Sequence, residues 1–185
     1  MQIKEKNRKE IEIRLKTLGN YVKIDYLASC LKEQSLDFDT RRYVLLELAK
    51  LYKERKMFSE AGKMLHAAAP INTTYKGMLS DYVASAEMFV KGGNFENSDI
   101  SFEKALACAN DNEKFEIKQI KIDYYKHRAE EYLRDDKRTN AVAAFEKLLT
   151  LNLALTERKE IQEKLLNLYD KLGRIKDYYN LKNNM

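Results

Sequence analysis

The side chains best suited to nucleophilic, acid–base or metal chemistry are two histidines, His66 and His127, and two cysteines, Cys30 and Cys108. A catalytic constellation needs a nucleophile, a base and an orienting group, and a metal centre needs ligands at short, regular spacing. Neither histidine has such partners in the sequence around it. We interpret His66, beside Leu65 in an expected helix, as a packed structural residue. The cysteines lie near alanines in different expected helices, which favours reduced thiols with a packing role.

His127 shares an expected helix face with Glu130 and Arg134. A solvated cluster of mixed charge is the simpler interpretation of that face, although it is also a candidate for partner binding. Adjacent carboxylates such as Asp135 and Asp136 point apart on a helix, so they do not form an acid–base pair.

The glycine pair Gly92-Gly93 is the segment closest to a phosphate-binding loop. It is followed by Asn94-Phe95 rather than by the Lys-Ser of a P-loop, and it fits a tight turn between two helices. The sequence therefore predicts a protein that is not an enzyme and that binds no metal ion and no cofactor.

Residues 81–109 are expected to form a helical hairpin around that glycine pair. Each helix has one apolar stripe in which small and large side chains alternate, as close packing of two helices requires. The stripes consist of Tyr82, Ala86 and Phe89, and of Phe95, Ser98, Phe102 and Ala105. Neither helix has enough apolar surface to fold alone, so the hairpin needs neighbours.

The same pattern recurs along the chain. Large residues late in each first helix are Leu15, Tyr52, Phe89, Tyr132 and Tyr169, at intervals of 37, 37, 43 and 37 residues. Such a period is typical of stacked helix pairs, and the single proline and six glycines are too few for a sheet-rich fold. We therefore expect an all-α fold: a right-handed α-solenoid of about five antiparallel helix pairs, forming one domain over residues 1–185.

Two finer expectations follow from the repeat. The 43-residue interval predicts the longest helix at about residues 112–134. The terminal hairpins are expected to pack through residues that include Tyr21 and Ile24 at one end and Ile175 and Tyr178 at the other.

These residues resemble an array of tetratricopeptide repeats (TPRs), with a period a few residues longer than is usual in that family. The resemblance covers nearly the whole chain for fold, and it is carried by small and aromatic residues at packing positions of three hairpins. The matching residues are Leu45, Ala49, Tyr52, Phe58, Ala61, Leu65 and Ala68; then Tyr82, Ala86, Phe89, Gly93, Phe95, Ser98, Phe102 and Ala105; and then Tyr125, Ala129, Tyr132, Ala141, Phe145 and Leu148.

The resemblance implies a function in protein–protein interaction. In TPR-like arrays the first helix of each pair lines a concave groove, and apolar residues among charges of both signs suit a partner helix or extended peptide. We therefore expect an adaptor, scaffold or assembly subunit. The candidate partner-binding residues are Tyr43, Leu46, Glu47, Lys50, Val83, Ala84, Glu87, Val90, Lys91, Lys126, His127, Glu130, Leu133 and Arg134.

The net charge of +5 is concentrated at the ends of the chain: residues 1–20 and 171–185 each carry +3, and the body between them is close to neutral. The simpler explanation of this charge is that it keeps the two ends solvated. The more specific explanation is that one end docks onto an acidic surface. Helical-repeat RNA binding through the basic ends and the tyrosines is the alternative function. Self-association through the terminal hairpins, where Tyr178 and Tyr179 lie, is a further possibility.

The first sixteen residues, MQIKEKNRKEIEIRLK, are charged almost throughout and lack the apolar run of a secretory signal. No stretch approaches the roughly 20 apolar residues that a membrane-spanning helix needs. We therefore expect a cytoplasmic protein without membrane insertion.

Overall fold

The structure is a computed structural model that describes residues 3–185. Within these residues it contains ten α-helices, one short 3-10 helix and no strand, so the all-α prediction is confirmed for them. The chain falls into two compact units: the first ends at Lys114 and the second begins at Phe115. The units are described separately below, and the single domain over residues 1–185 stays a prediction.

In the first unit lie α1 (Arg8–Lys16), α2 (Asn20–Cys30), α3 (Phe38–Glu54), α4 (Phe58–Ala68), η1 (Ala69–Ile71), α5 (Tyr75–Lys91) and α6 (Phe95–Cys108). The second unit holds most of α7 (Asp111–Arg134), together with α8 (Arg138–Leu149), α9 (Leu155–Lys171) and α10 (Ile175–Asn183). At 24 residues, α7 is the longest helix of the part described, as the 43-residue interval predicts.

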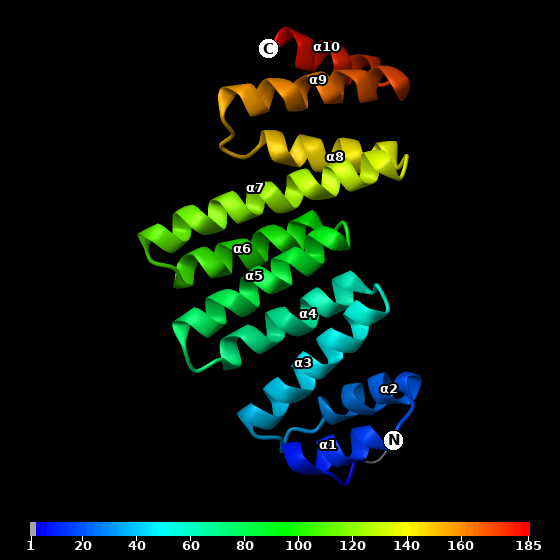
Figure 1. Cartoon of the computed structure of the whole chain (residues 1–185), viewed down its shortest axis with the longest axis vertical. Coiled ribbons are helices and arrows are strands. Elements are labelled where there is room, and N and C mark those ends of the chain that lie inside the picture. The colour runs from blue at the N-terminus through cyan, green and yellow to red at the C-terminus, as the bar shows by residue number, and fades with distance from the viewer. Residues whose placement is uncertain (1–2) are drawn as a thin grey trace. The chain divides into compact units, whose positions relative to one another are not determined.

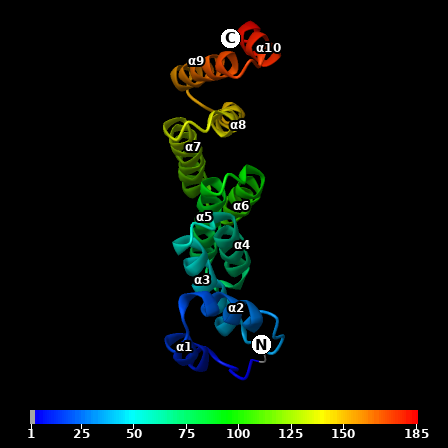
Figure 2. The same cartoon turned by 90° about the vertical axis from the view of Figure 1, so that its right-hand side faces the viewer.

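Within each unit the helices form two layers (Figures 1 and 2). In the first unit α3 and α5 lie on one side, and α4 and α6 lie on the other. In the second unit α7 and α9 lie on one side, and α8 and α10 on the other. The first helices of successive hairpins are therefore neighbours within a unit, which decides the residues that can share a surface.

Side chains at the helix starts explain where several of these helices begin. The carboxylate of Asp37 accepts the backbone N–H of Thr40, and the hydroxyl of Thr74 accepts that of Gly77. The side-chain oxygen of Asn94 accepts the N–H of Asn97 at the start of α6 in the same way. Each bond satisfies a backbone donor that has no partner inside the helix.

Four hairpins are closed by one turn geometry, which recurs at the spacing expected from the sequence. Its central residue has a left-handed backbone: φ is +59° at Lys56, +73° at Gly93, +54° at Asp136 and +67° at Gly173. These positions are 37, 43 and 37 residues apart. The residue after each has φ between −80° and −95° and ψ between 63° and 77°.

Hydrogen bonding at the four turns is also the same. The N–H that follows the left-handed residue donates to the carbonyl of an aromatic residue five positions earlier. These bonds run from Met57 to Tyr52 (2.9 Å), from Asn94 to Phe89 (2.9 Å), from Lys137 to Tyr132 (2.8 Å) and from Arg174 to Tyr169 (2.8 Å). This is a Schellman-type helix end, which satisfies carbonyls that the helix leaves free.

The first hairpin ends differently, although its turn lies at the expected glycine. Gly19 has φ of −69° and precedes α2, and the N–H of Leu18 bonds to Leu15 only three residues back. The resemblance between hairpins therefore holds for the four turns after Tyr52, Phe89, Tyr132 and Tyr169, and it does not extend to this one.

Small residues let helices of neighbouring hairpins pack closely against aromatic rings. A Cβ atom placed on Gly62 of α4 would lie 3.0 Å from the ring of Phe89 on α5. Glycine at this position therefore allows α4 and α5 to approach each other closely. Several of the predicted packing residues are fully buried: Ala61, Ala86, Phe102, Ala105, Tyr125, Ala129, Ala141, Phe145 and Leu148.

For two residues near the ends of the chain, the prediction that they pack in the interior is wrong. Tyr21 is 81% exposed and Ile175 is 66% exposed, whereas Ile24 is buried and Tyr178 is half-buried as expected. Helical periodicity places a residue on a face, but a terminal hairpin has neighbours on one side only, so part of its apolar face stays in solvent.

We expect Lys56→Gly to stabilise the first unit, because lysine is strained at a left-handed φ that glycine adopts freely. The expected gain in the free energy of unfolding is about 0.5–1 kcal/mol, measured by urea denaturation followed by circular dichroism.

The matched control is Lys104→Gly, which makes the same change at an exposed position inside α6. There glycine should cost about 1 kcal/mol because it weakens a helix interior. Destabilisation by both variants would contradict the left-handed turn at Lys56.

Candidate functional site

The first unit has a hollow between α3 and α5, which we call the α3/α5 hollow. Its volume is about 310 Å³. The lining is mostly apolar, with three charged side chains at its rim, and consists of Leu46, Ala49, Lys50, Lys53, Leu65, Ala84, Glu87 and Met88. The hollow can accept one or two side chains of a partner, but it has no catalytic group.

A second hollow, the N-terminal hollow, lies on the other side of Lys50 in the same unit. Its volume is about 300 Å³, and its lining is more polar. It is lined by Leu15, Asn20, Lys23, Glu47, Lys50, Leu51 and Glu54. Lys50 therefore forms part of the wall of both hollows, which makes α3 the centre of the recessed surface of the first unit.

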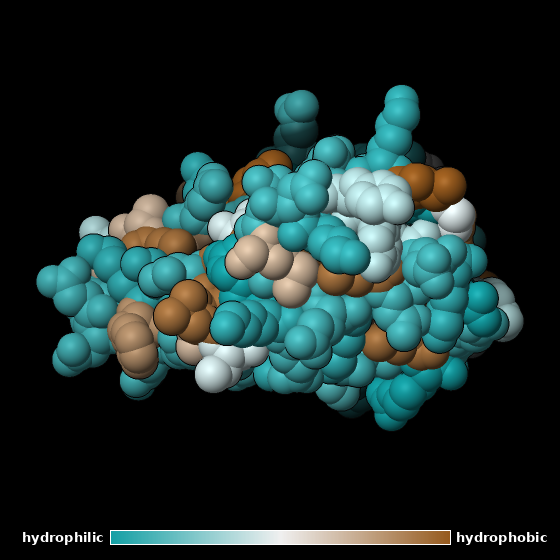
Figure 3. Space-filling model, turned by 90° about the horizontal axis from the view of Figure 1, so that it is seen from above, coloured by the Kyte–Doolittle hydropathy of each residue, from teal (hydrophilic) through white to brown (hydrophobic). Residues whose placement is uncertain are grey.

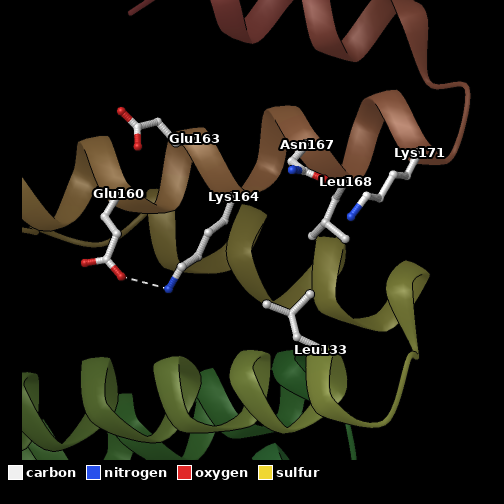
Figure 4. A pocket seen from close by; sticks show the side chains of 7 residues that line it. All are labelled: Leu133, Glu160, Glu163, Lys164, Asn167, Leu168 and Lys171. Atoms are coloured by element: carbon white, nitrogen blue, oxygen red, sulfur yellow. Dashed lines mark hydrogen bonds and ion pairs between the residues drawn. The ribbon is translucent and has the colours of Figure 1, made fainter.

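The second unit has its own hollow of about 410 Å³, the α7/α9 hollow. It is lined by Leu133 of α7 and by Glu160, Glu163, Lys164, Asn167, Leu168 and Lys171 of α9 (Figure 4). In Figure 4, Leu168 points toward Leu133 across the gap between the helices, whereas Glu163 points away from it. The middle of this hollow is thus apolar and its ends are charged.

The three hollows use equivalent positions of the repeat. Each includes the residues five, two and one positions before the aromatic residue that accepts the turn bond. These are Glu47, Lys50 and Leu51 on α3; Ala84, Glu87 and Met88 on α5; and Lys164, Asn167 and Leu168 on α9. The turn and the hollow therefore recur with one spacing, although the side chains in the hollow change from hairpin to hairpin.

Six of the fourteen candidate partner-binding residues line these hollows: Leu46, Glu47, Lys50, Ala84, Glu87 and Leu133. Val90, in contrast, is only 2% exposed and lines none of these three hollows. Its position is equivalent to Lys53 and Leu133, and periodicity alone did not reveal that α5 is covered more completely than α3.

The remaining candidates surround the hollows and several are held in ion pairs. Lys91 bonds to Glu87 at 2.6 Å, Lys126 to Glu157 at 3.4 Å, and Glu130 to Lys164 at 2.6 Å. Tyr43 and Val83 are half-buried and Arg134 is exposed. Tyr43, Val83 and Lys91 lie in the first unit, and Lys126, Glu130 and Arg134 lie in the second.

His127 forms its ion pair with Glu131 rather than with Glu130. Its Nε2 lies 3.3 Å from a carboxylate oxygen of Glu131, one helical turn along, and its side chain is 69% exposed. The adjacent Glu130 faces α9 instead, because Lys164 draws it there.

Sequence reasoning missed the α9 residues of the third hollow. The interval of 37 residues from Tyr132 to Tyr169 would have placed Lys164 and Asn167 at positions equivalent to His127 and Glu130. The last hairpin keeps few packing residues of the repeat, so its sequence gives only a weak signal for groove positions on α9.

The positive charge of Lys164 in the α7/α9 hollow is balanced by two carboxylates. Its Nζ donates to Glu130 at 2.6 Å and to Glu160 at 2.7 Å, and Figure 4 shows the second of these bonds. Partial burial opposes the charge, but the two carboxylates outweigh it and raise the pKa of Lys164. This lysine is thus committed to its own chain and is not free for a partner.

His66 takes part in a buried chain of hydrogen bonds in the first unit, which agrees with its interpretation as a structural residue. Its Nδ1 lies 2.9 Å from the hydroxyl of Ser101, which lies 3.1 Å from that of Ser85. Ser85 donates to the carbonyl of Gly62 at 2.8 Å. Because each hydroxyl has one proton, the complete chain requires the proton of the imidazole on Nδ1.

This network offers no hydrolytic chemistry, although it joins a histidine to a serine. Ser85 and Ser101 are fully buried, so no substrate carbonyl can reach either hydroxyl. Among residues 3–185, no group of three or more His, Cys, Asp or Glu side chains is placed to hold a metal ion.

Exposed hydrophobic residues are scattered rather than gathered on the face shown in Figure 3. That face is largely hydrophilic, with separate hydrophobic patches. In the part of the chain that the structure describes, no helix is both long and apolar enough to cross a lipid bilayer.

Comparison with known proteins gives no family. No family model matches the chain, and no curated protein matches it. Among solved structures the chain is similar to the crystal structure of BtubC (BKLC) from P. vanneervenii, with 15% sequence identity and a TM-score of 0.36. The match covers 95% of this chain and 77% of that one, and it is too weak to assign a fold.

We expect the first unit to lose stability in mild acid through His66. Burial, and then the charge of Lys104, lower the pKa of His66 below its ordinary value. Below the ordinary histidine pKa of about 6.5 the unfolded chain therefore binds more protons than the folded chain, so the free energy of unfolding falls as the pH falls. Urea titrations between about pH 5 and 7.5 measure this dependence.

His66→Gln should reduce that dependence, since it removes the buried imidazole. His127→Gln removes the exposed histidine, retains His66, and should keep the dependence of the wild type. If the free energy of unfolding depends on pH equally in the wild type and in His66→Gln, the dependence does not come from His66.

Proposed function

We propose that the chain is a non-catalytic protein–protein interaction module, an adaptor, scaffold or assembly subunit that holds a peptide or helix of a partner. The proposal includes its architecture: a right-handed, TPR-like α-solenoid of about five helix pairs. Its groove consists of the hollows between first helices of successive hairpins.

The recurrence of the hollows is the observation that supports this function most. In three places the residues five, two and one positions before the turn-bonding aromatic residue line a recess of 300–410 Å³. A recess repeated at the period of the fold can bind successive side chains of one partner segment, whereas an enzyme needs one specialised site.

The repeated turn supports the proposed architecture. Stacked helix pairs require each hairpin to close at the same angle, and the four turns share backbone angles and hydrogen bonds. RNA binding and self-association through the terminal hairpins stay predictions, as does a location in the cytoplasm.

The test is selection of a random peptide library on the wild-type protein, followed by the same selection on Ala84→Gln. Ala84 is part of the floor of the α3/α5 hollow, and the longer neutral amide would fill that space. We expect peptides selected by the wild type to bind Ala84→Gln at least about tenfold more weakly, a loss of about 1.4 kcal/mol.

Ala107→Gln is the matched control, because it makes the same change at an exposed position of α6. It should bind the selected peptides as the wild type does, and circular dichroism should show that both variants remain helical. Selection of no peptide, or equal binding to Ala84→Gln, would overturn the proposed function.

A further inference from the structure

Helix α10 of the second unit has two faces of different character. It lies against α9 (Figure 1), and its half-buried residues include Tyr178 and Leu181. None of its residues is buried. Another face carries two large hydrophobic side chains, Ile175, which is 66% exposed, and Tyr179, which is 58% exposed. Because these residues are four positions apart, they form one apolar stripe along the helix.

Lysines flank that stripe on both sides. At about 3.6 residues per turn, Lys176 and Lys182 fall on opposite edges of the stripe, and both are exposed. Among the described residues, no carboxylate lies within ion-pair distance of either lysine. Asp177, the acidic residue of α10, is held by Arg174 at 2.6 Å. The exposed face of α10 is therefore apolar along its middle and cationic at both edges.

Equivalent positions of other hairpins show that this face does not suit close packing against a further helix. The residue ten positions after the turn-bonding aromatic residue is Gly62 on α4 and Val142 on α8, both buried, but it is Tyr179 on α10. The residue thirteen positions after it is Phe145 on α8, which is fully buried, but Lys182 on α10. A bulky and a charged side chain thus replace the small and apolar ones that allow helices to stack.

We propose that this face of α10 docks onto an anionic lipid surface. Ile175 and Tyr179 enter the boundary between headgroups and acyl chains, and Lys176 and Lys182 pair with the anionic headgroups. A lipid surface adapts to side chains of any size, and tyrosine and lysine place their polar ends at the headgroups while their apolar parts are buried. The helix lies along the surface and does not cross it.

Charge and shape argue against two other occupants. A symmetric contact with a second copy would bring the same residues of both chains together, so Lys176 and Lys182 would face like charges. Nucleic acid would pair with the lysines, but it has no apolar layer that Ile175 could enter. An anionic lipid surface satisfies both the lysines and the apolar stripe.

The experiment is flotation of the whole chain with vesicles of phosphatidylcholine that contain about 30% phosphatidylserine, compared with vesicles of phosphatidylcholine alone. The wild type should bind the anionic vesicles and not the neutral ones. Lys176→Glu with Lys182→Glu should weaken binding at least about tenfold, and Lys176→Arg with Lys182→Arg should retain it. Ile175→Gln with Tyr179→Gln keeps the charge and should weaken binding at least about fivefold.

Two controls match these variants. Lys32→Glu with Lys76→Glu makes the same change of net charge at exposed lysines of the first unit. Phe38→Gln with Tyr75→Gln removes two aromatic residues that are 79% and 77% exposed. Both controls should bind as the wild type does, and circular dichroism should show that all variants remain helical.

Four outcomes would overturn this docking surface. They are equal binding to neutral and anionic vesicles, equal losses in the α10 variants and the controls, normal binding by Ile175→Gln with Tyr179→Gln, and capture of single-stranded RNA in place of vesicles. Ala84→Gln should bind vesicles normally, because the residues of α10 line none of the three hollows. A failure here therefore leaves the proposed peptide-binding function standing, and the reverse also holds.

Discussion

One backbone hydrogen bond, repeated four times, sets the geometry on which the other features depend. At each turn an N–H reaches back five residues to the carbonyl of Tyr52, Phe89, Tyr132 or Tyr169, and the residue between helices takes a left-handed φ. The bond pairs a carbonyl that the helix end would leave free, and the left-handed residue reverses the chain within a few positions. Each of these four hairpins therefore closes in the same way whatever its surface residues are, and small buried residues such as Ala86 and Ala129 then let its helices approach closely.

The shared turn has a structural consequence, because it places equivalent residues of the first helices beside equivalent gaps. The hollows differ in chemistry only through the side chains that fill those positions. Lys164 is neutralised by two carboxylates, whereas Lys50 has none within ion-pair distance in the described structure. A repeated backbone with variable side chains explains why one hollow can hold unpaired lysines while another holds a lysine paired with two carboxylates.

Much of the fold could be predicted from sequence, because the intervals between Tyr52, Phe89, Tyr132 and Tyr169 reflect the turns themselves. Glycine marks two of those turns, and Asp136 belongs to a residue type that tolerates a left-handed φ, but Lys56 carries no such signal and only the spacing indicates its turn. The candidate site was predicted in part. Periodicity gives the face of a helix but not how far neighbours cover it. It therefore predicts a groove position for Val90, which lines none of the three hollows, and a packed position for Tyr21, which is exposed.

The most direct test of the shared turn is NMR spectroscopy of the isotope-labelled protein. Intraresidue amide–Hα contacts and coupling constants report φ, and amide exchange reports protection by hydrogen bonding. A left-handed φ is predicted at Lys56, Gly93, Asp136 and Gly173, with protected amides one residue later and an ordinary negative φ at Gly19. A negative φ at Lys56 or Asp136 would contradict the common turn and, with it, the equivalence of the hollows.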